Sequence, residues 1–174
     1  IGYSMTLRFP WERIYKLALE KPGYGVFSTA RLPEREALFK WVGPVGCYDW
    51  IMLAKADSPI KLTTLEQAKA YRIGAYKGDA IGERLLAQGL NPVLLLRDQD
   101  NAKKLVNGQI DLWAAGDPTG PYLARLEGVT GLKTVLRFHH ADLYLALNKE
   151  TPDEVVNKLQ AALDQLRAEG GVEK

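Results

Sequence analysis

The sequence predicts an α/β fold with a largely parallel sheet, and three observations point to this class. From about residue 64 onward, short apolar segments alternate with amphipathic segments that carry helix caps, as in strands joined by helices. The composition is that of a globular protein, because 47% of the 174 residues are hydrophobic and 25% are charged. No internal repeat or low-complexity segment interrupts this pattern. A chain of this length suits one domain or two small lobes.

The first third of the chain is expected to begin as strand, helix and strand. Residues 3–9 alternate between apolar and polar side chains, with Met5, Leu7 and Phe9 on one face, which predicts a strand. Pro10 suits the first position of the following helix, because its missing N–H group would have no partner there. The segments expected next are a strand at 24–30, a short helix starting at Pro33, a break at 43–46 and a strand at 50–54.

Helices and strands alternate regularly in the middle of the chain. Residues 64–67 have a capping-box pattern, and Asp79 and Asp100 can each cap a helix. Gly89 and Gly108 are suited to end those two helices. The expected helices cover 79–88, 100–108 and 118–127, and the expected strands cover 71–76, 93–96, 110–115 and 132–138. The strand at 93–96 is expected to be buried.

The C-terminal part is predicted to hold one more strand, at 142–147, and then a long helix. Residues 151–154 combine a capping box with a proline at the first helical position. Gly170 and Gly171 end this helix. Its apolar face is formed by Val155, Leu159, Ala162, Leu163 and Leu166.

Composition and motifs argue against several classes of function. The 23 basic and 21 acidic residues give a net charge of +2, which supports neither nucleic acid nor an anionic membrane surface as a partner. The single cysteine, Cys47, excludes an intramolecular disulfide, and no run of 18 apolar residues predicts a membrane span. Residues 74–78 lack the Lys-Ser/Thr of a phosphate-binding loop, and the neighbouring His139 and His140 would point to opposite faces of a strand. We therefore expect no catalytic residues, cofactor, metal site, nucleic-acid partner or membrane insertion.

What remains is a set of junctions that suit ligand binding, because α/β sheets bind ligands at the carboxyl ends of their strands. Three strand-to-helix junctions carry suitable side chains, at residues 9–11, 28–35 and 76–80. Gly116 and Asp117 follow a fourth strand.

The order of motifs along the chain resembles that of the family 3 extracellular solute-binding proteins, the periplasmic receptors of amino-acid-type ABC transporters. The matching motifs are F-S-T-A-R-L-P-E-R-E, F-K-W-V-G-P, K-A-D-S-P-I, L-E-Q-A-K, R-I-G-A-Y-K-G, L-V-N-G-Q-I-D and Y-L-A-L-N-K-E-T-P. They run from about Met5 to the last helix and so cover nearly the whole chain.

This resemblance implies a two-lobed fold of the periplasmic-binding-protein type (type II), with hinge strands that let the lobes close on a ligand. Lobe one would hold residues 1–52 and return at 145–174, and lobe two would hold 53–144. Family members have a further strand and helix before the segment at 3–9 and a final helix after the last one here. We therefore expect that lobe one is incomplete and that it exposes a sheet edge.

The resemblance also assigns ligand-binding roles in lobe one. Arg35 matches the arginine that pairs with the α-carboxylate of the ligand, which suits the forked guanidinium; the alternative is a surface arginine paired with a neighbouring glutamate. Arg31 is either a second anion contact or a solvated side chain. Trp11 matches an aromatic position that packs on the ligand, or else belongs to the core. The other expected contacts are Ser28, Thr29 and Ala30 at a strand end, while Tyr48 and Trp50 are weaker candidates.

In lobe two, Gly78, Asp79 and Ala80 match the turn in which helix amides meet the ligand carboxylate. The family has Ser or Thr after the glycine, so that Asp79 and Ala80 depart from the pattern, and Asp79 can occupy the free amides itself. Asp117 matches only approximately the acid that takes the ammonium group of the ligand. These departures predict a small polar ligand with an anionic group at Arg35 and a cationic or hydrogen-bond-donating group at Asp79 or Asp117.

The resemblance implies a periplasmic or extracellular receptor with a small-molecule ligand and a membrane ABC permease as partners. Two other functions stay open. One is a ligand-sensing domain of a membrane receptor kinase or cyclase, and the other is an enzyme of the dehydratase type on the same fold. An enzyme would need an acid or base with a shifted pKa in the cleft, for which Asp79 and Asp117 are the candidates.

Overall fold

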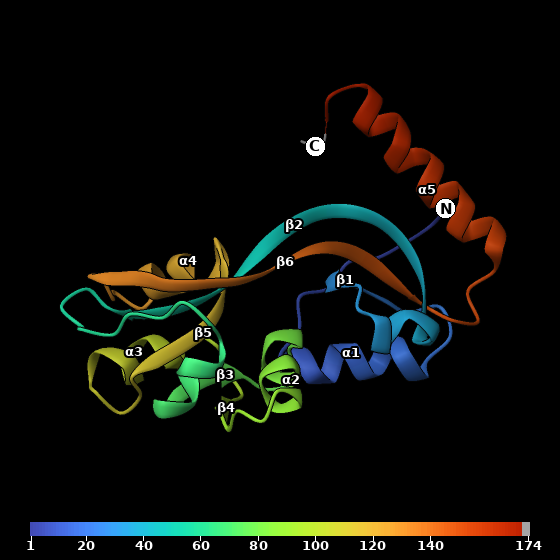
Figure 1. The fold of residues 1–174 in the computed structure, drawn as a ribbon. Helices are drawn as coiled ribbons and strands as arrows, with labels where there is room; N and C mark the ends of the chain where they lie inside the picture. The colour runs from blue at the N-terminus through green and yellow to red at the C-terminus, as the bar shows by residue number, and fades with distance from the viewer. Residues whose placement is uncertain (172–174) are drawn as a thin grey trace. The chain divides into compact units, whose positions relative to one another are not determined.

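The computed structural model describes residues 1–171, which form five α-helices, two short 3-10 helices and six strands (Figure 1). The helices are α1 (Trp11–Glu20), α2 (Ala80–Ala87), α3 (Asp100–Val106), α4 (Thr119–Leu126) and α5 (Asp153–Ala168), with 3-10 helices η1 (Pro33–Leu38) and η2 (Glu66–Ala70). The strands are β1 (Gly25–Ala30), β2 (Phe39–Lys55), β3 (Ile73–Tyr76), β4 (Val93–Leu95), β5 (Leu112–Asp117) and β6 (Leu132–Asn148). No helix within this described part is long and apolar enough to cross a bilayer.

The strands form one mixed sheet in the order β1-β6-β2-β5-β3-β4. Strand β3 runs parallel to both β4 and β5, which are its neighbours. The pairs β1–β6 and β2–β5 are antiparallel. The predicted α/β class is therefore confirmed, but the sheet is mixed rather than largely parallel, with the parallel pairings located in β3, β4 and β5.

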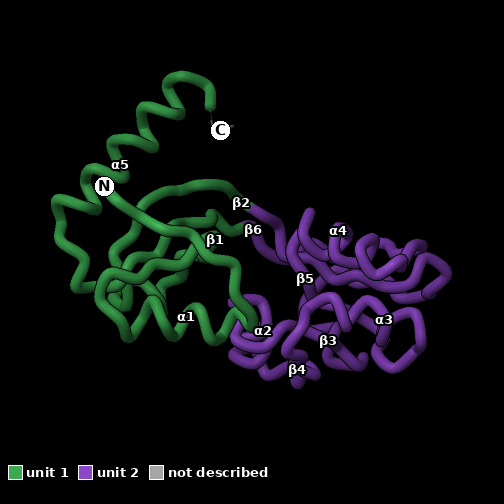
Figure 2. Tube along the Cα trace, turned by 180° about the vertical axis from the view of Figure 1, so that it is seen from behind, with its two compact units in different colours: residues 1–47, 141–174 green, residues 48–140 purple. Residues whose placement is uncertain are grey.

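The chain divides into two compact units, which are coloured separately in Figure 2. Unit 1 holds residues 1–47 and the described residues from Ala141 onward, and unit 2 holds Tyr48–His140. Strands β2 and β6 each run from one unit into the other. The division expected from the resemblance, at 52/53 and 144/145, falls within the same two strands.

The core of unit 1 joins α1 to the sheet. Ala18 of α1 packs with Val26, Phe39 and Ala146, and the half-buried aromatic side chains of Trp11 and Tyr15 pack against this cluster. The amide of Asn148 donates to the carbonyl oxygens of Ala18 and Leu19 and so holds the end of α1. A second cluster attaches α5 through Val156, Leu159 and Leu163 to Val42 and Leu147.

The core of unit 2 lies between the sheet and helices α3 and α4. Ile51, Leu53, Trp113 and Ala115 from β2 and β5 pack with Ala102 and Leu105 of α3 and Ala124 of α4. On α2, Ile81 and Leu85 are buried. The helices predicted at 79–88, 100–108 and 118–127 are thus confirmed as α2, α3 and α4.

The predicted strand at residues 3–9 is wrong. Tyr3, Met5, Leu7 and Phe9 are 62–87% exposed, and this segment belongs to no strand of the described sheet. Its alternating pattern is local, whereas a strand requires hydrogen bonds from a neighbouring strand.

The predicted break at 43–46 is also wrong, because β2 continues through it. A Cβ atom on Gly43 would lie 2.5 Å from the ring of Tyr144, so that glycine here permits close packing between β2 and β6. The side chain of Gln160 on α5 accepts a hydrogen bond from the Gly43 N–H at 2.9 Å and donates one to its carbonyl oxygen at 3.3 Å. These contacts support an extended backbone that the sequence marks as a turn.

Three smaller predictions also need correction. The segments predicted at 132–138 and 142–147 form one continuous strand, β6. Strand β4 was expected to be buried, but it is an edge strand and Val93 is 50% exposed. Asp100 and Thr151 do not cap their helices, because the N-cap residues are Gln99 and Pro152. The hydroxyl of Thr151 is buried and has no hydrogen-bond partner in the described structure.

Candidate functional site

The candidate site in unit 2 lies at the carboxyl ends of β3, β4 and β5. Since β3 is parallel to both neighbours, the three strands end at the same edge. The Lys77 N–H donates to the Leu95 carbonyl oxygen at 2.9 Å, which joins the first residue beyond β3 to the last residue of β4. Gly78 then turns the chain with a φ of +74°, a conformation that side chains other than glycine rarely adopt.

Asp79 caps helix α2, as the sequence predicts. Its Oδ2 accepts a hydrogen bond at 3.3 Å from the N–H of Ile81. Ala80 is buried and carries no hydroxyl group. The carboxylate of Asp79 therefore occupies part of the helix end that would otherwise be open to an anionic group of a ligand.

Asp98 is a further acidic residue at this edge, and the sequence analysis missed it. Its Oδ1 accepts hydrogen bonds from Trp113 Nε1 at 2.9 Å and from Asn101 Nδ2 at 3.3 Å. Burial raises the pKa of Asp98 to about 7; Trp113 and Asn101 oppose this shift, and the negative charge of Asp79 adds to it. The rule that singled out the other junctions would have found Asp98, because it lies three residues beyond the end of β4.

Asp117 belongs to an ion-pair cluster that joins three strands. It lies opposite Asp49 in the register of β5 and β2. Arg137 of β6 binds both carboxylates: its Nη1 donates to Asp49 at 2.8 Å and its Nη2 donates to Asp117. His140 contacts Asp49 at 2.7 Å, and this hydrogen bond, together with the charge of Arg137, lowers the pKa of Asp49. The sequence analysis identified Asp117 but neither its partner Arg137 nor Asp49.

The two histidines lie in different surroundings. His139 packs on Trp50, with ring centroids 4.4 Å apart, and burial lowers its pKa, assisted by the charges of Arg84 and His140. Trp50 is only 1% exposed, so that it belongs to the core of unit 2. Its Nε1 is buried and has no hydrogen-bond partner among the described residues. Tyr48 packs edge-on against Trp50.

In unit 1, Arg35 is buried, and the surface alternative is therefore wrong. It is 2% exposed, and its guanidinium carbon lies 4.9 Å from the ring centroid of Tyr15. Tyr15 in turn packs edge-on against Phe39 and tilts against Trp11, with ring centroids 5.2 and 6.4 Å apart. Arg35 and Trp11, both predicted site residues, are thus brought to the same aromatic ring.

Arg31 is exposed but held by several groups. Its Nε donates to Glu36 at 2.7 Å, and Glu36 raises the pKa of Arg31 while Arg31 lowers that of Glu36. Its guanidinium carbon lies 5.7 Å from the ring centroid of Trp41 and 5.1 Å from that of Tyr144. Arg31 is therefore ordered rather than merely solvated.

The predicted contacts on β1 differ in accessibility. Ser28 is exposed, whereas Thr29 and Ala30 are buried. The Thr29 hydroxyl donates to the Val26 carbonyl oxygen at 3.1 Å, so that it satisfies the strand itself. Trp11, Ser28, Thr29, Ala30 and Arg35 lie in unit 1, and Gly78, Asp79, Ala80 and Asp117 lie in unit 2.

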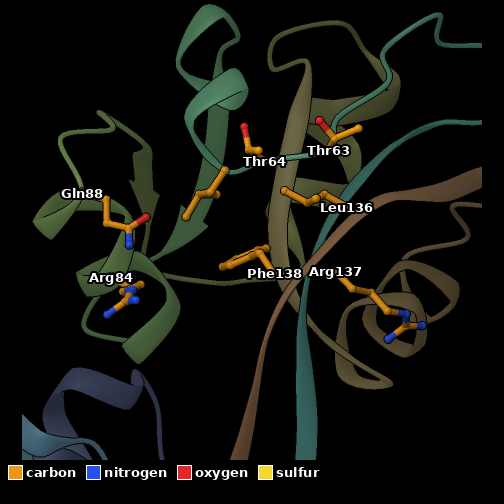
Figure 3. Close-up of a pocket in the computed structure, with 8 residues that line it drawn as sticks. Thr63, Thr64, Arg84, Gln88, Leu136, Arg137 and Phe138 are labelled. Atoms are coloured by element: carbon orange, nitrogen blue, oxygen red, sulfur yellow. The ribbon is translucent and has the colours of Figure 1, made fainter.

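Unit 2 also contains a cavity of about 310 Å³. It is lined by Thr63, Thr64, Leu65, Arg84, Gln88, Leu136, Arg137 and Phe138, none of which the sequence analysis proposed as a site residue. In Figure 3 the Arg137 guanidinium points away from the side chains of Thr64, Gln88 and Phe138. The hydrogen bonds of Arg137 to Asp49 and Asp117 account for this direction.

Several solved structures are similar to this chain. One is a histidine kinase sensor domain with similarity to periplasmic binding proteins, with 21% identity, coverage of 84% of this chain and 64% of that chain, and a TM-score of 0.76. Another is a mutant of ArgBP from T. maritima, with 14% identity, coverage of 95% and 72%, and a TM-score of 0.83. A third is an ABC uptake transporter substrate-binding protein from Streptococcus pneumoniae with bound histidine, with 17% identity, coverage of 82% and 61%, and a TM-score of 0.71.

This chain thus spans less than two thirds of the sensor domain and of the S. pneumoniae protein. No protein-family model matches the chain, and no curated protein matches it significantly. At these identities the structural likeness establishes the architecture. The fold is the mixed α/β fold of two-lobed periplasmic binding proteins.

Proposed function

We propose that the protein is a solute-binding receptor that captures a small polar ligand, an amino acid or a related compound. The observation that carries this proposal is the carboxyl edge of β3, β4 and β5, where Asp79 follows β3, Asp98 follows β4 and Asp117 is the last residue of β5. Sheets of this kind bind ligands at that edge. Similarity to an amino-acid-binding fold, including a protein with bound histidine, supports the proposal.

The charges in each unit suggest the chemical class of the ligand. In unit 1, the buried guanidinium of Arg35 is the proposed partner of an anionic group, and the ring of Tyr15 helps to orient it. In unit 2, Asp79 is the proposed partner of a cationic or hydrogen-bond-donating group. Asp117 is a weaker candidate for that role, because Arg137 already neutralises it. These two charges suggest a ligand with both an anionic and a cationic group, as in an amino acid.

The resemblance in motif order adds the cellular setting of the proposal. The receptor would act in the periplasm or outside the cell and would deliver its ligand to a membrane permease of the ABC type. Binding of the ligand would favour a closed state, which the permease would distinguish from the open state.

A sensor function is the second candidate, and the likeness to a histidine kinase sensor domain supports it. The two functions differ in what ligand binding changes in the cell. In an uptake receptor, deletion of the gene abolishes accumulation of the labelled ligand. In a sensor, deletion leaves uptake intact and abolishes the ligand-dependent phosphorylation or cyclase response.

Isothermal titration calorimetry with L-amino acids, polyamines and organic acids tests the binding proposal. We expect at least one compound to bind. Asp79→Asn should lower the affinity for a cationic compound by about 10- to 100-fold, as expected for the loss of a charged hydrogen bond. Asp100→Asn is the matched control, because Asp100 begins α3 and pairs only loosely with Arg97, at 4.0 Å. Unchanged affinity in Arg35→Ala and Arg35→Lys would remove Arg35 from the site. Turnover of prephenate or arogenate would contradict a binding function and favour the enzyme.

A further inference from the structure

Two carboxyl groups at the candidate edge come from adjacent parallel strands. In the register of β3 and β4, Tyr76 lies opposite Leu95. Asp79 lies three residues beyond Tyr76, and Asp98 lies three residues beyond Leu95. The hydrogen bond from Lys77 to Leu95 extends the pairing past the end of β3. The two acidic residues are therefore held at neighbouring places by the backbone.

The Asp98 carboxyl group is held in one orientation by the elements packed around it. From β5, the fully buried Trp113 donates its indole N–H, and from α3, the fully buried Asn101 donates its amide N–H, both to Oδ1. Asn101 fits here because residue 74 is glycine: a Cβ atom on Gly74 would lie 2.2 Å from Asn101 Oδ1.

We propose that Asp98 is a positioning residue that acts through Asp79. Its ionisation sets how much negative charge the start of α2 presents to a cationic group of the ligand. This inference rests on the proposed function, because it concerns the same edge of unit 2. A ligand cation beside Asp79 stabilises the ionised form of Asp98, whereas a ligand anion there opposes it. Cationic compounds then bind more tightly as the pH rises through neutrality, and anionic compounds bind less tightly.

The charged and polar groups around Asp98 support a titration in this range. Burial raises the pKa of Asp98 to about 7. The hydrogen bond from Trp113 lowers this pKa, and the negative charge of Asp79 raises it further. Asp79 is the charged group that faces it from α2, and Trp113 and Asn101 are the polar groups from β5 and α3. Arg97, its neighbour in sequence, lies near Asp100 and Glu127, at 4.0 and 3.9 Å.

The Trp113 indole provides a spectroscopic signal for this ionisation that requires no ligand. We would record the indole N–H signals of the ¹⁵N-labelled protein between pH 5 and 9 and assign Trp113 by its absence in Trp113→Phe. Should that variant fail to fold, Trp113 is instead the indole whose titration is lost in Asp98→Asn, which keeps a side-chain oxygen as acceptor. We expect the Trp113 signal to titrate with a midpoint near pH 7, as the pKa of about 7 for Asp98 implies.

The variants Asp79→Asn and Asp100→Asn then distinguish electrostatic coupling between Asp79 and Asp98 from the general effect of losing one negative charge. Asp79→Asn should move the midpoint to lower pH, because the charge of Asp79 raises the pKa of Asp98. Asp100→Asn, next to the site but paired with Arg97, should leave it unchanged. The inference is overturned if no indole signal titrates in this range, if the titration persists in Asp98→Asn, or if Asp79→Asn leaves the midpoint in place. Failure of every compound to bind would instead contradict the proposed function and leave this titration intact.

Discussion

At the scale of single residues, Asp98 makes the stability of the fold depend on pH. Its pKa of about 7 in the folded state lies above the ordinary value of 3.8, so that the folded state binds the proton more tightly than the unfolded state. The stabilisation is complete below about pH 4 and is lost as the pH rises through 7. We expect Asp98→Asn to be more stable than the wild type at pH 8, by roughly 2–4 kcal/mol, and to lose this advantage at pH 4. Urea denaturation at both pH values measures this, and an equal difference at both would contradict it.

The sequence could predict those site residues whose role depends on near neighbours. Asp79 was identified as a helix cap because its acceptor position precedes α2 directly, and the structure bears this out through Ile81. Arg137, the partner of Asp117, was missed because the two meet only through the pairing of β2 with β5 and β6, across 20 residues of sequence. Asp98 likewise accepts its hydrogen bond from Trp113, 15 residues away, and this bond opposes the rise in its pKa. Spacing along the chain gives no signal for such contacts.

At the scale of elements, helix α5 is attached to β2 by one side chain in particular. Gln160 bonds both the N–H and the carbonyl group of Gly43, where the strand passes its glycine and proline residues. We expect Gln160→Ala to cost about 1–2 kcal/mol, because these partly buried backbone groups lose their partner. Gln165→Ala on the same helix is the control, since Gln165 is exposed and bonds Glu169. Urea denaturation compares the two, and equal losses would show that Gln160 does not support β2.

The same distinction, between contacts near in the sequence and contacts far apart in it, explains which elements were predicted correctly. Helices carry their hydrogen bonds and caps within the segment, so α2 could be placed from its cap and terminal glycine and α5 from its apolar face. Strands take their hydrogen bonds from other segments, and their ends are therefore set by partners. Pairing in the sheet carries β2 through 43–46, whereas the alternating segment at 3–9 has no strand beside it in the described sheet.

At the scale of the whole molecule, strands β2 and β6 connect the stabilities of the two units. Each is 17 residues long and contributes to both cores. In β2, Val42 packs in unit 1 and Ile51 packs in unit 2. In β6, Leu147 packs in unit 1 and Leu132 packs in unit 2. Unfolding of either unit removes the neighbours of a strand that the other unit needs, which favours a single cooperative transition.

A substitution confined to unit 2 should therefore destabilise unit 1 equally. A Cβ atom on Gly120 of α4 would lie 2.6 Å from the Ala115 Cβ, and we expect Gly120→Ala to cost about 1–3 kcal/mol through overpacking. Gly46→Ala is the control, because nothing lies within 4 Å of a Cβ atom there. In a urea titration followed by indole N–H signals, Trp41 of unit 1 and Trp113 of unit 2 should share one midpoint, and Gly120→Ala should lower both together. If Trp41 keeps its wild-type midpoint while that of Trp113 falls, the units unfold independently, and the continuity of β2 and β6 does not couple them.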